Sequence, residues 1–237
     1  MTPQSPVFYH FYKGVAAIAA PLVWYRVSRK LARHGVSPAR RRERLGHATL
    51  PRPEGRLIWF HAASVGESLS VLALARRMIE RNDRTEVLIT SGTASSAEIL
   101  ETRMPPGCRH QFAPLDRADA LRRFLGHWKP DAAIFVESEL WPQMLASAHK
   151  AGVPLALVNA RLSASSLKNW KRVDATARYL LGLFRLIRTQ DQRTLDGLIE
   201  LGADPARVAR GPNLKAMSEP LPVDEIDYAE VEAAYSG

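Results

Sequence analysis

Two short stretches of the sequence combine carboxylates with a histidine and hydroxyl groups. The first reads HAASVGE at 61–67, and the second reads ESELWP at 137–142. Their candidate site residues are His61, Ser64, Gly66, Glu67, Glu137 and Glu139. A lone glutamate in a loop is usually a solvated acid, but two carboxylates that face one cleft suit general-base chemistry on a hydroxyl group. We interpret Glu67 as a candidate base and His61 as a residue that lines or supports the site.

Other chemistries have weaker support in the sequence. Neither the dinucleotide fingerprint GxGxxG nor the phosphate-binding loop GxxxxGK[ST] occurs, so a nicotinamide-dependent oxidoreductase is disfavoured. The histidines lack metal-binding spacing such as HExxH. Ser64 could be a nucleophile in principle, but its surroundings do not form a GxSxG elbow. A hydrolase is therefore a less favoured interpretation.

The elements that must position these residues follow a regular alternation. From residue 57 onward, short apolar runs alternate with amphipathic stretches, which is typical of parallel strands joined by crossover helices. We expect strands at 57–61, 86–90, 110–113, 132–136, 155–159, 185–189 and 208–209. We expect helices at 68–81, 94–103, 117–128, 142–150, 166–184 and 192–201. This predicts an α/β fold with a doubly wound, Rossmann-like parallel sheet.

Such a sheet has its ligand crevice at the carboxyl ends of the strands, where the strand order reverses. With the common order 3-2-1-4-5-6, the first and fourth strands adjoin at that point. Glu67 follows the first of these strands and Glu137 follows the fourth. The two carboxylates are therefore expected on opposite lips of one crevice.

The first 50 residues carry most of the chain's net charge of +9. They hold nine basic residues and one acid, and their stretch 8–25 is apolar and rich in aromatic residues, interrupted by Lys13 and Pro21. The clean apolar run is shorter than the roughly 17 to 25 residues of a spanning helix. Aromatic and basic side chains together suit the headgroup level of an anionic bilayer. We expect residues 1–50 to lie on or dip into a membrane surface; a helix packed on its own domain is the alternative.

Composition limits the remaining choices. The 237 residues are 46% hydrophobic and 24% charged, a globular balance. A single cysteine, Cys108, excludes a disulfide framework and indicates a reducing compartment such as the cytoplasm. We assign 51–218 to the Rossmann-like domain and 219–237, which is purely acidic in its charged residues, to a linker.

Six blocks of sequence resemble, in order and spacing, the 3-deoxy-D-manno-octulosonic acid (Kdo) transferases. They are RERLG at 42–46, HAASVGE at 61–67, TSGT at 90–93, ESELWP at 137–142, NARLS at 159–163 and GPNLK at 211–215. The likeness spans essentially the whole chain, and HAASVGE and ESELWP are its most distinctive parts. Pro212 departs from the family's uninterrupted GNLK.

The resemblance implies a membrane-associated, inverting glycosyltransferase whose acceptor-binding half is the N-terminal half of a glycosyltransferase-B fold. It implies transfer of Kdo from CMP-Kdo to the 6′-hydroxyl of a lipid A precursor, lipid IVA, in lipopolysaccharide core biosynthesis. Glu67 would be the general base. Substrate-binding residues would be His61, Ser64, Gly66, Thr93, Glu137, Glu139, Arg161 and Lys215. No metal, no further cofactor and no nucleic acid are expected, and the site would face the cytoplasm at the bacterial inner membrane.

Members of the resembled family are normally much longer than this chain. We therefore expect the donor-binding half to be absent here and this chain alone to be inactive. Two alternatives stay open, a non-catalytic module that binds lipid phosphates and an unrelated cytosolic nucleotide-binding domain. We also expect Glu67 to stay ionised without a raised pKa, because the N-terminus of the following helix favours an anion.

Overall fold

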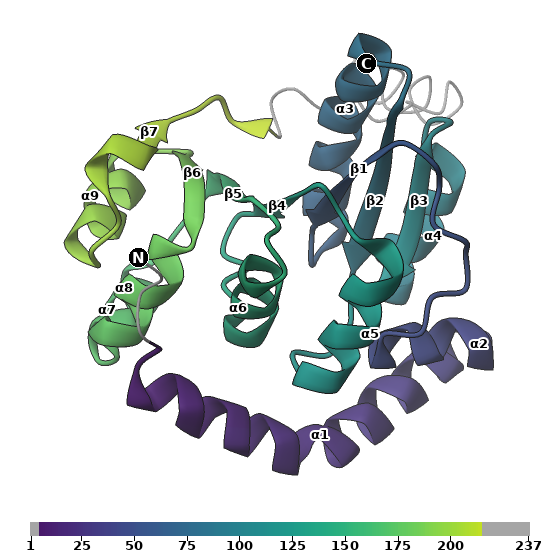
Figure 1. The fold of residues 1–237 in the computed structure, drawn as a ribbon, viewed down its shortest axis with the longest axis horizontal. Helices are drawn as coiled ribbons and strands as arrows, with labels where there is room; N and C mark the ends of the chain where they lie inside the picture. The colour runs from purple at the N-terminus through teal and green to yellow at the C-terminus, as the bar shows by residue number, and fades with distance from the viewer. Residues whose placement is uncertain (1–4, 215–237) are drawn as a thin grey trace, which may run out of the picture.

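A parallel sheet of seven strands forms the centre of the computed structural model, which describes residues 5–214 (Figure 1). Its strands are β1 (Arg56–His61), β2 (Thr85–Ser91), β3 (Cys108–Phe112), β4 (Ala132–Val136), β5 (Leu155–Ala160), β6 (Phe184–Thr189) and β7 (Val208–Arg210). Their order is β3-β2-β1-β4-β5-β6-β7. The doubly wound sheet and the adjacency of the first and fourth strands are thus confirmed. Lys215 and the expected linker 219–237 lie outside the described residues.

Helices cover both faces of the sheet. One face carries α3 (Val65–Arg81) and α4 (Ala94–Arg103), and the other carries α5 (Ala118–Trp128), α6 (Pro142–Lys150), α8 (Asp174–Gly182) and α9 (Gln192–Glu200). Along β1, Leu57 and Trp59 pack in the cluster with α5 and α6, whereas Ile58 and Phe60 pack against α3. Because strand side chains alternate between two covered faces, residues 57–60 of β1 are all apolar.

One expected helix, 166–184, is wrong in its extent. The structure has two helices there, α7 (Ala164–Lys171) and α8, and Phe184 already belongs to β6. The break lies at Val173, whose backbone is not helical, at φ −128° and ψ 44°. No glycine or proline marks this position, so the amphipathic pattern runs through the break without a visible interruption.

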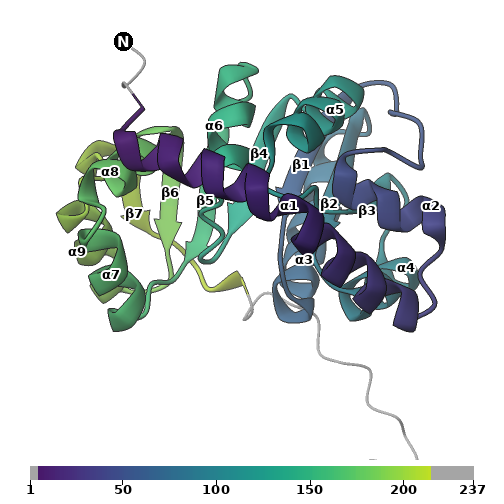
Figure 2. The ribbon, with the colours of Figure 1, turned by 90° about the horizontal axis from the view of Figure 1, so that it is seen from below.

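A long N-terminal helix, α1 (Val7–Arg33), crosses the molecule outside the α5 and α6 layer (Figures 1 and 2). Near its start Tyr9 packs on Tyr179 of α8, with ring centroids 5.5 Å apart. Near its end Leu31 packs against α4 and against Phe112 of β3. The helix bends in Figure 1, and it contains Pro21, which removes a backbone hydrogen bond.

Across residues 5–214, no helix is both long enough and apolar enough to cross a bilayer.

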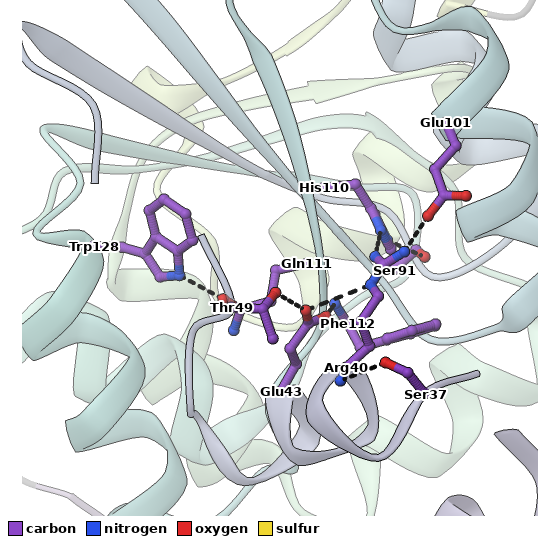
Figure 3. Close-up of polar contacts among 10 residues, drawn as sticks. All are labelled: Ser37, Arg40, Glu43, Thr49, Ser91, Glu101, His110, Gln111, Phe112 and Trp128. Atoms are coloured by element: carbon purple, nitrogen blue, oxygen red, sulfur yellow. Dashed lines mark hydrogen bonds and ion pairs between the residues drawn. The ribbon is translucent and has the colours of Figure 1, made fainter. Parts of the chain in front are cut away.

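The RERLG motif clamps the N-terminal segment onto the edge strand β3. Its residues form the short helix η1 (Arg42–Leu45), which follows α2 (Pro38–Arg41). The fully buried Glu43 carboxylate accepts hydrogen bonds from the Phe112 N–H at 2.7 Å and from the Thr49 hydroxyl (Figure 3). Gly46 ends the turn at φ +84°, and a Cβ there would lie 2.0 Å from the Ala120 carbonyl oxygen. Only glycine fits this approach.

A buried histidine extends this clamp. The Arg40 guanidinium donates to His110 Nδ1 at 2.7 Å and also pairs with Glu101, while His110 Nε2 lies 3.0 Å from the Ser91 hydroxyl (Figure 3). Because arginine can only donate, Nδ1 accepts and the proton of the neutral ring sits on Nε2. Burial and the Arg40 charge lower the pKa of His110 from 6.5 to about 3.

We predict that His110 makes the fold sensitive to mild acid. Its pKa is lower in the folded chain than in the unfolded chain, so unfolding takes up a proton below pH 6.5 and stability falls as the pH drops toward 3. At pH 5 this single group should cost about 2 kcal/mol relative to pH 7.5. Urea denaturation at both pH values, for the native chain and for His110→Gln, measures the difference.

The matched control is His34→Gln, because His34 lies exposed just after α1. The native chain and His34→Gln should lose the same stability between pH 7.5 and 5, and His110→Gln should lose about 2 kcal/mol less. An equal loss in all three chains would contradict the assignment of the acid sensitivity to His110.

Candidate active site

The candidate site lies where β1 and β4 end side by side. His61, the last residue of β1, pairs in register with Phe135 of β4. The chain then leaves β1 toward α3 on one face of the sheet, and it leaves β4 through the loop 137–141 toward α6 on the other. This is the expected switch point, with Glu67 following one strand and Glu137 and Glu139 following the other.

Glu67 is held in place by the start of α3. The Ser64 hydroxyl caps the helix by accepting from the Glu67 N–H at 3.3 Å. In return, one Glu67 oxygen accepts from the Ser64 hydroxyl and the other from the Ala63 N–H, both at 2.9 Å. This is a variant of the capping box, in which a serine and a glutamate three residues later satisfy each other's polar groups. Glu67 is 8% exposed, and each of its oxygens keeps a second lone pair.

The expectation that the pKa of Glu67 is not raised is wrong. Burial raises the pKa of this carboxyl above its usual range. The hydrogen bonds from Ala63 and Ser64 lower it, and the nearby negative charges of Glu139 and Glu137 raise it again. Desolvation together with two like charges therefore outweighs the N-terminal hydrogen bonds.

His61 lies beside these acids, and its orientation is set by Thr90 of β2. The Thr90 hydroxyl accepts from Trp59 Nε1 at 2.8 Å and donates its one proton to the Phe60 carbonyl at 3.2 Å. His61 Nδ1 lies 3.0 Å from the same oxygen, within hydrogen-bond distance. The other nitrogen, Nε2, points toward Glu139 at 3.4 Å.

Glu139 is the second ordered carboxylate of the site. One of its oxygens faces His61 Nε2 and also accepts a hydrogen bond from the Trp141 indole N–H. Burial opposes ionisation of this group, but His61 and Trp141 outweigh it, and the pKa of Glu139 lies below its usual range. The environment thus favours the anion at Glu139 and the protonated form at Glu67.

Glu137 and Arg161 occupy the turns that leave β4 and β5. Glu137 has a φ of +57°, an uncommon backbone for a residue other than glycine, and such positions concentrate at functional sites. The neighbouring Ser138 hydroxyl donates to the Arg161 carbonyl, which ties the two turns together. Arg161 itself is exposed at the end of β5. The structure therefore brings the expected Arg161 to the same edge of the sheet.

Two other expected site residues, Thr93 and Ser64, have structural roles, and a third, Gly66, has none. Thr93 caps α4 by accepting from the Ser96 N–H at 3.2 Å, and Ser64 caps α3. Gly66 is exposed and lies inside the first turn of α3, so it does not supply a turn before the helix.

A half-buried acid next to the site, Asp116, was not among the expected site residues. Asp116 accepts hydrogen bonds from the N–H groups of Gln143 and Met144, at 3.1 and 2.6 Å, and so caps α6 from another part of the chain. It also accepts from the Tyr12 hydroxyl of α1 at 2.8 Å. Burial raises the pKa of Asp116, and these hydrogen bonds oppose that shift. Only its place after β3 hinted at a role.

An aromatic pocket of about 430 Å³ adjoins Glu139. Phe8 and Tyr12 of α1 form one part of its lining, the loop 137–141 contributes Glu139 and Trp141, and α7 contributes Trp170. Such a volume and composition suit a small organic ligand. In the part of the chain that the structure covers, no three histidine, cysteine or acidic side chains are grouped so that they could hold a metal ion.

We predict that Ser64 tunes Glu67 as well as capping α3. Ser64→Ala should lower the free energy of unfolding by about 1 kcal/mol, the usual value of an N-cap. It should also raise the pKa of Glu67 further, because a hydrogen bond that favours the anion is lost. A carbon-detected NMR titration of the glutamate carboxyl groups measures the second effect.

Ser163→Ala is the matched control, since Ser163 caps α7 by accepting from the Ser166 N–H at 3.1 Å. It should show a similar loss of stability with the Glu67 titration unchanged. The interpretation fails if Ser64→Ala also leaves that titration where it was.

Comparison with known proteins identifies the family of this chain. Residues 39–218 match the family described as 3-deoxy-D-manno-octulosonic-acid transferase. A probable mitochondrial Kdo transferase of Arabidopsis thaliana is 40% identical over 162 residues, which is 68% of this chain and 36% of that protein. The Kdo transferase of Rickettsia bellii is 40% identical over 169 residues, or 71% of this chain and 40% of the relative. The chain spans about two-fifths of the length of these relatives.

Solved structures agree on the fold. A UDP-N-acetylglucosamine 2-epimerase from Rickettsia bellii superposes with a TM-score of 0.51 at 13% identity, covering 75% of this chain and 52% of that one. The corresponding enzyme of Neisseria meningitidis, bound to UDP-GlcNAc, gives 0.50 at 13% identity, covering 67% and 47%. The expected Rossmann-like half of a glycosyltransferase-B fold is confirmed. With the match over 39–218, the chain belongs to the Kdo transferase family.

Proposed function

We propose that this chain is the acceptor-binding half of an inverting transferase that moves Kdo from CMP-Kdo to the 6′-hydroxyl of a lipid A precursor. Glu67 is the general base in this proposal. The observation that carries it is a buried carboxylate with a raised pKa, oriented by the start of α3 and facing two further acids at the switch point. The donor would bind to a domain in the part of the relatives that this chain does not span.

The raised pKa of Glu67 suits a base. A general base works best when its pKa lies close to the working pH, because a more basic carboxylate takes a proton more readily. A pKa raised by burial makes the Glu67 carboxylate a better proton acceptor than an ordinary glutamate. Its second lone pairs are available for the acceptor hydroxyl.

In the proposed transfer of Kdo, one bond forms, one bond breaks and one proton moves. The acceptor oxygen forms a bond to the anomeric carbon of Kdo as its proton passes to a Glu67 oxygen. The bond from that carbon to the CMP phosphate breaks, and CMP leaves with the electron pair on the opposite face, which inverts the configuration. Glu139, held anionic by His61 and Trp141, keeps the pKa of Glu67 high and can accept hydrogen bonds from other acceptor hydroxyls.

The acceptor of this proposal is a lipid, and α1 offers a surface for it. Large hydrophobic residues on α1 are exposed, and they are Val7, Phe8, Phe11, Val15, Ile18, Leu22, Val23 and Tyr25. Exposed basic residues follow on the same helix, namely Arg26, Arg29, Lys30 and Arg33. An apolar face with adjacent cations suits an anionic membrane surface at the cytoplasmic side of the inner membrane.

We predict that Glu67→Gln lowers kcat by about 10² or more in a protein that joins this chain to a donor-binding half, while acceptor binding changes little. The acid limb of the kcat/KM profile of the parent protein should lie above the pKa of an ordinary glutamate, because burial raises the pKa of Glu67. Steady-state kinetics with CMP-Kdo and lipid IVA across pH measure both effects.

Glu139→Gln separates the base from its neighbour. It removes a negative charge that raises the pKa of Glu67, so the acid limb should move to lower pH with turnover largely retained. Near-normal kcat in Glu67→Gln, together with lost turnover in Glu139→Gln or Glu137→Gln, would assign the base to the loop after β4. Tight binding of CMP by the present chain would mean that the two halves are assigned the wrong way round.

We predict that α1 brings the chain to anionic vesicles. Co-sedimentation should be strong with vesicles that contain phosphatidylglycerol at low salt and weaker at high salt, because salt screens the basic residues. The double variant Phe11→Ser and Ile18→Ser should lower binding at both salt concentrations. Leu50→Ser, at an exposed leucine outside α1, is the control and should bind normally. Equal binding to neutral vesicles would contradict the electrostatic part.

A further inference from the structure

A second cavity, of about 420 Å³, lies between α1 and the carboxyl ends of the strands. One wall is a stripe of α1 side chains that begins at Tyr12 and ends at Val27. The members of this stripe lie at positions 12, 15, 16, 19, 20, 23 and 27, a spacing that places them on one helix face. With a rise of 1.5 Å per residue, the stripe is about 22 Å long. The cavity is therefore an elongated slot along the helix.

Small side chains on α1 create the space. Ala16, Ala19 and Ala20 line the slot at positions where a helix packed on a domain would ordinarily present larger apolar residues. The opposite wall is also mainly apolar, with Pro114, Leu115 and Met144. A slot of this shape and lining fits a narrow hydrocarbon better than a polar ligand.

The slot is continuous with the exposed apolar face of α1. Val15 and Val23 both line the slot, yet they remain 48% and 40% exposed. They therefore form its rim on the side of α1 that carries the other exposed hydrophobic residues. An alkyl chain of a lipid held in a bilayer against α1 could enter the slot over these two valines without leaving apolar surroundings.

A cation without a carboxylate partner lines the same slot. The Arg44 side chain donates to the Ala113 carbonyl, but its buried Nε has no hydrogen-bond partner, and no ion pair to Arg44 occurs among residues 5–214. Burial lowers the pKa of Arg44 to about 10, so the group is still positive at neutral pH. A half-buried positive charge without an ion-pair partner is stabilised by an anion that binds beside it.

We propose that the slot holds one alkyl chain of an anionic amphiphile, with the phosphate of its headgroup beside Arg44. The proposal rests on the proposed function, since it says where one chain of the lipid acceptor would lie. His61 and Glu139 also line the slot, so a chain seated there has the candidate active site along one wall. The length of the slot would then select acceptors by the length of that chain.

The test uses monomeric alkyl phosphates of six to twelve carbons, each below its micelle concentration, titrated into the full chain by calorimetry. Each methylene buried should strengthen binding about fourfold, until the chain fills the slot and the gain stops. Inorganic phosphate should bind at least 100-fold more weakly than decyl phosphate, which separates an amphiphile site from a free-phosphate site. Comparable binding of inorganic phosphate would overturn the alkyl part of the proposal.

Variants on two faces of α1 test where the alkyl chain of the ligand binds. Ala19→Leu fills the slot and should weaken decyl phosphate at least tenfold, whereas Ala17→Leu adds the same side chain at an exposed position and should not. Equal binding by both variants would place the alkyl chain on the outer surface of α1 and overturn the proposal. Ala16→Leu repeats the test at a second slot position if Ala19→Leu does not fold.

Decyl maltoside, which has no charge, tests the role of Arg44. It should bind the native chain at least tenfold more weakly than decyl phosphate, and Arg44→Gln should remove most of that difference. Equal affinities for the two amphiphiles in the native chain would reject an anion beside Arg44, whether or not the variant folds. None of these measurements includes a transfer step, so the slot and the proposed transferase activity can fail independently.

Discussion

The parallel pairing of β1 with β4 is the constraint on which the rest of the structure depends. Because the strand order reverses between them, α3 leaves toward one face of the sheet and α6 lies on the other, and neither helix covers the strand ends. His61 and Phe135 lie level in the register, so the loops that follow carry their acids to the same edge. The closeness of Glu67, Glu137 and Glu139 is thus a consequence of topology.

Two opposing effects act on the pKa of Glu67. The capping box gives both carboxylate oxygens a donor, which would favour the anion, yet desolvation and the two neighbouring acids shift the balance the other way. The result is a carboxylate with fixed geometry and increased affinity for a proton. Rigid placement and tuned basicity arise from the same few residues, so a change that improves the cap also changes the acid–base behaviour.

Elements that depend on hydrophobic periodicity were predictable from the sequence, and properties that depend on tertiary neighbours were not. The strands and most helices follow from alternating apolar runs, but the break at Val173 has no residue that signals it. The place of Glu67 near a helix N-terminus was predictable, but the expectation that its pKa is not raised was wrong, because its burial depends on tertiary neighbours. The contact of Tyr12 with Asp116 joins residues 104 apart in the chain, and no local pattern encodes it.

That contact also has a mechanical consequence. A single carboxylate, Asp116, holds the Tyr12 hydroxyl of α1 and the first N–H groups of α6, and α6 begins immediately after the loop that carries Glu139. The outermost helix and the start of α6 therefore share one half-buried hydrogen-bonding partner, which links the position of α1 to that of the acidic loop. The distance between α1 and the carboxylates is therefore set by hydrogen bonds inside the protein.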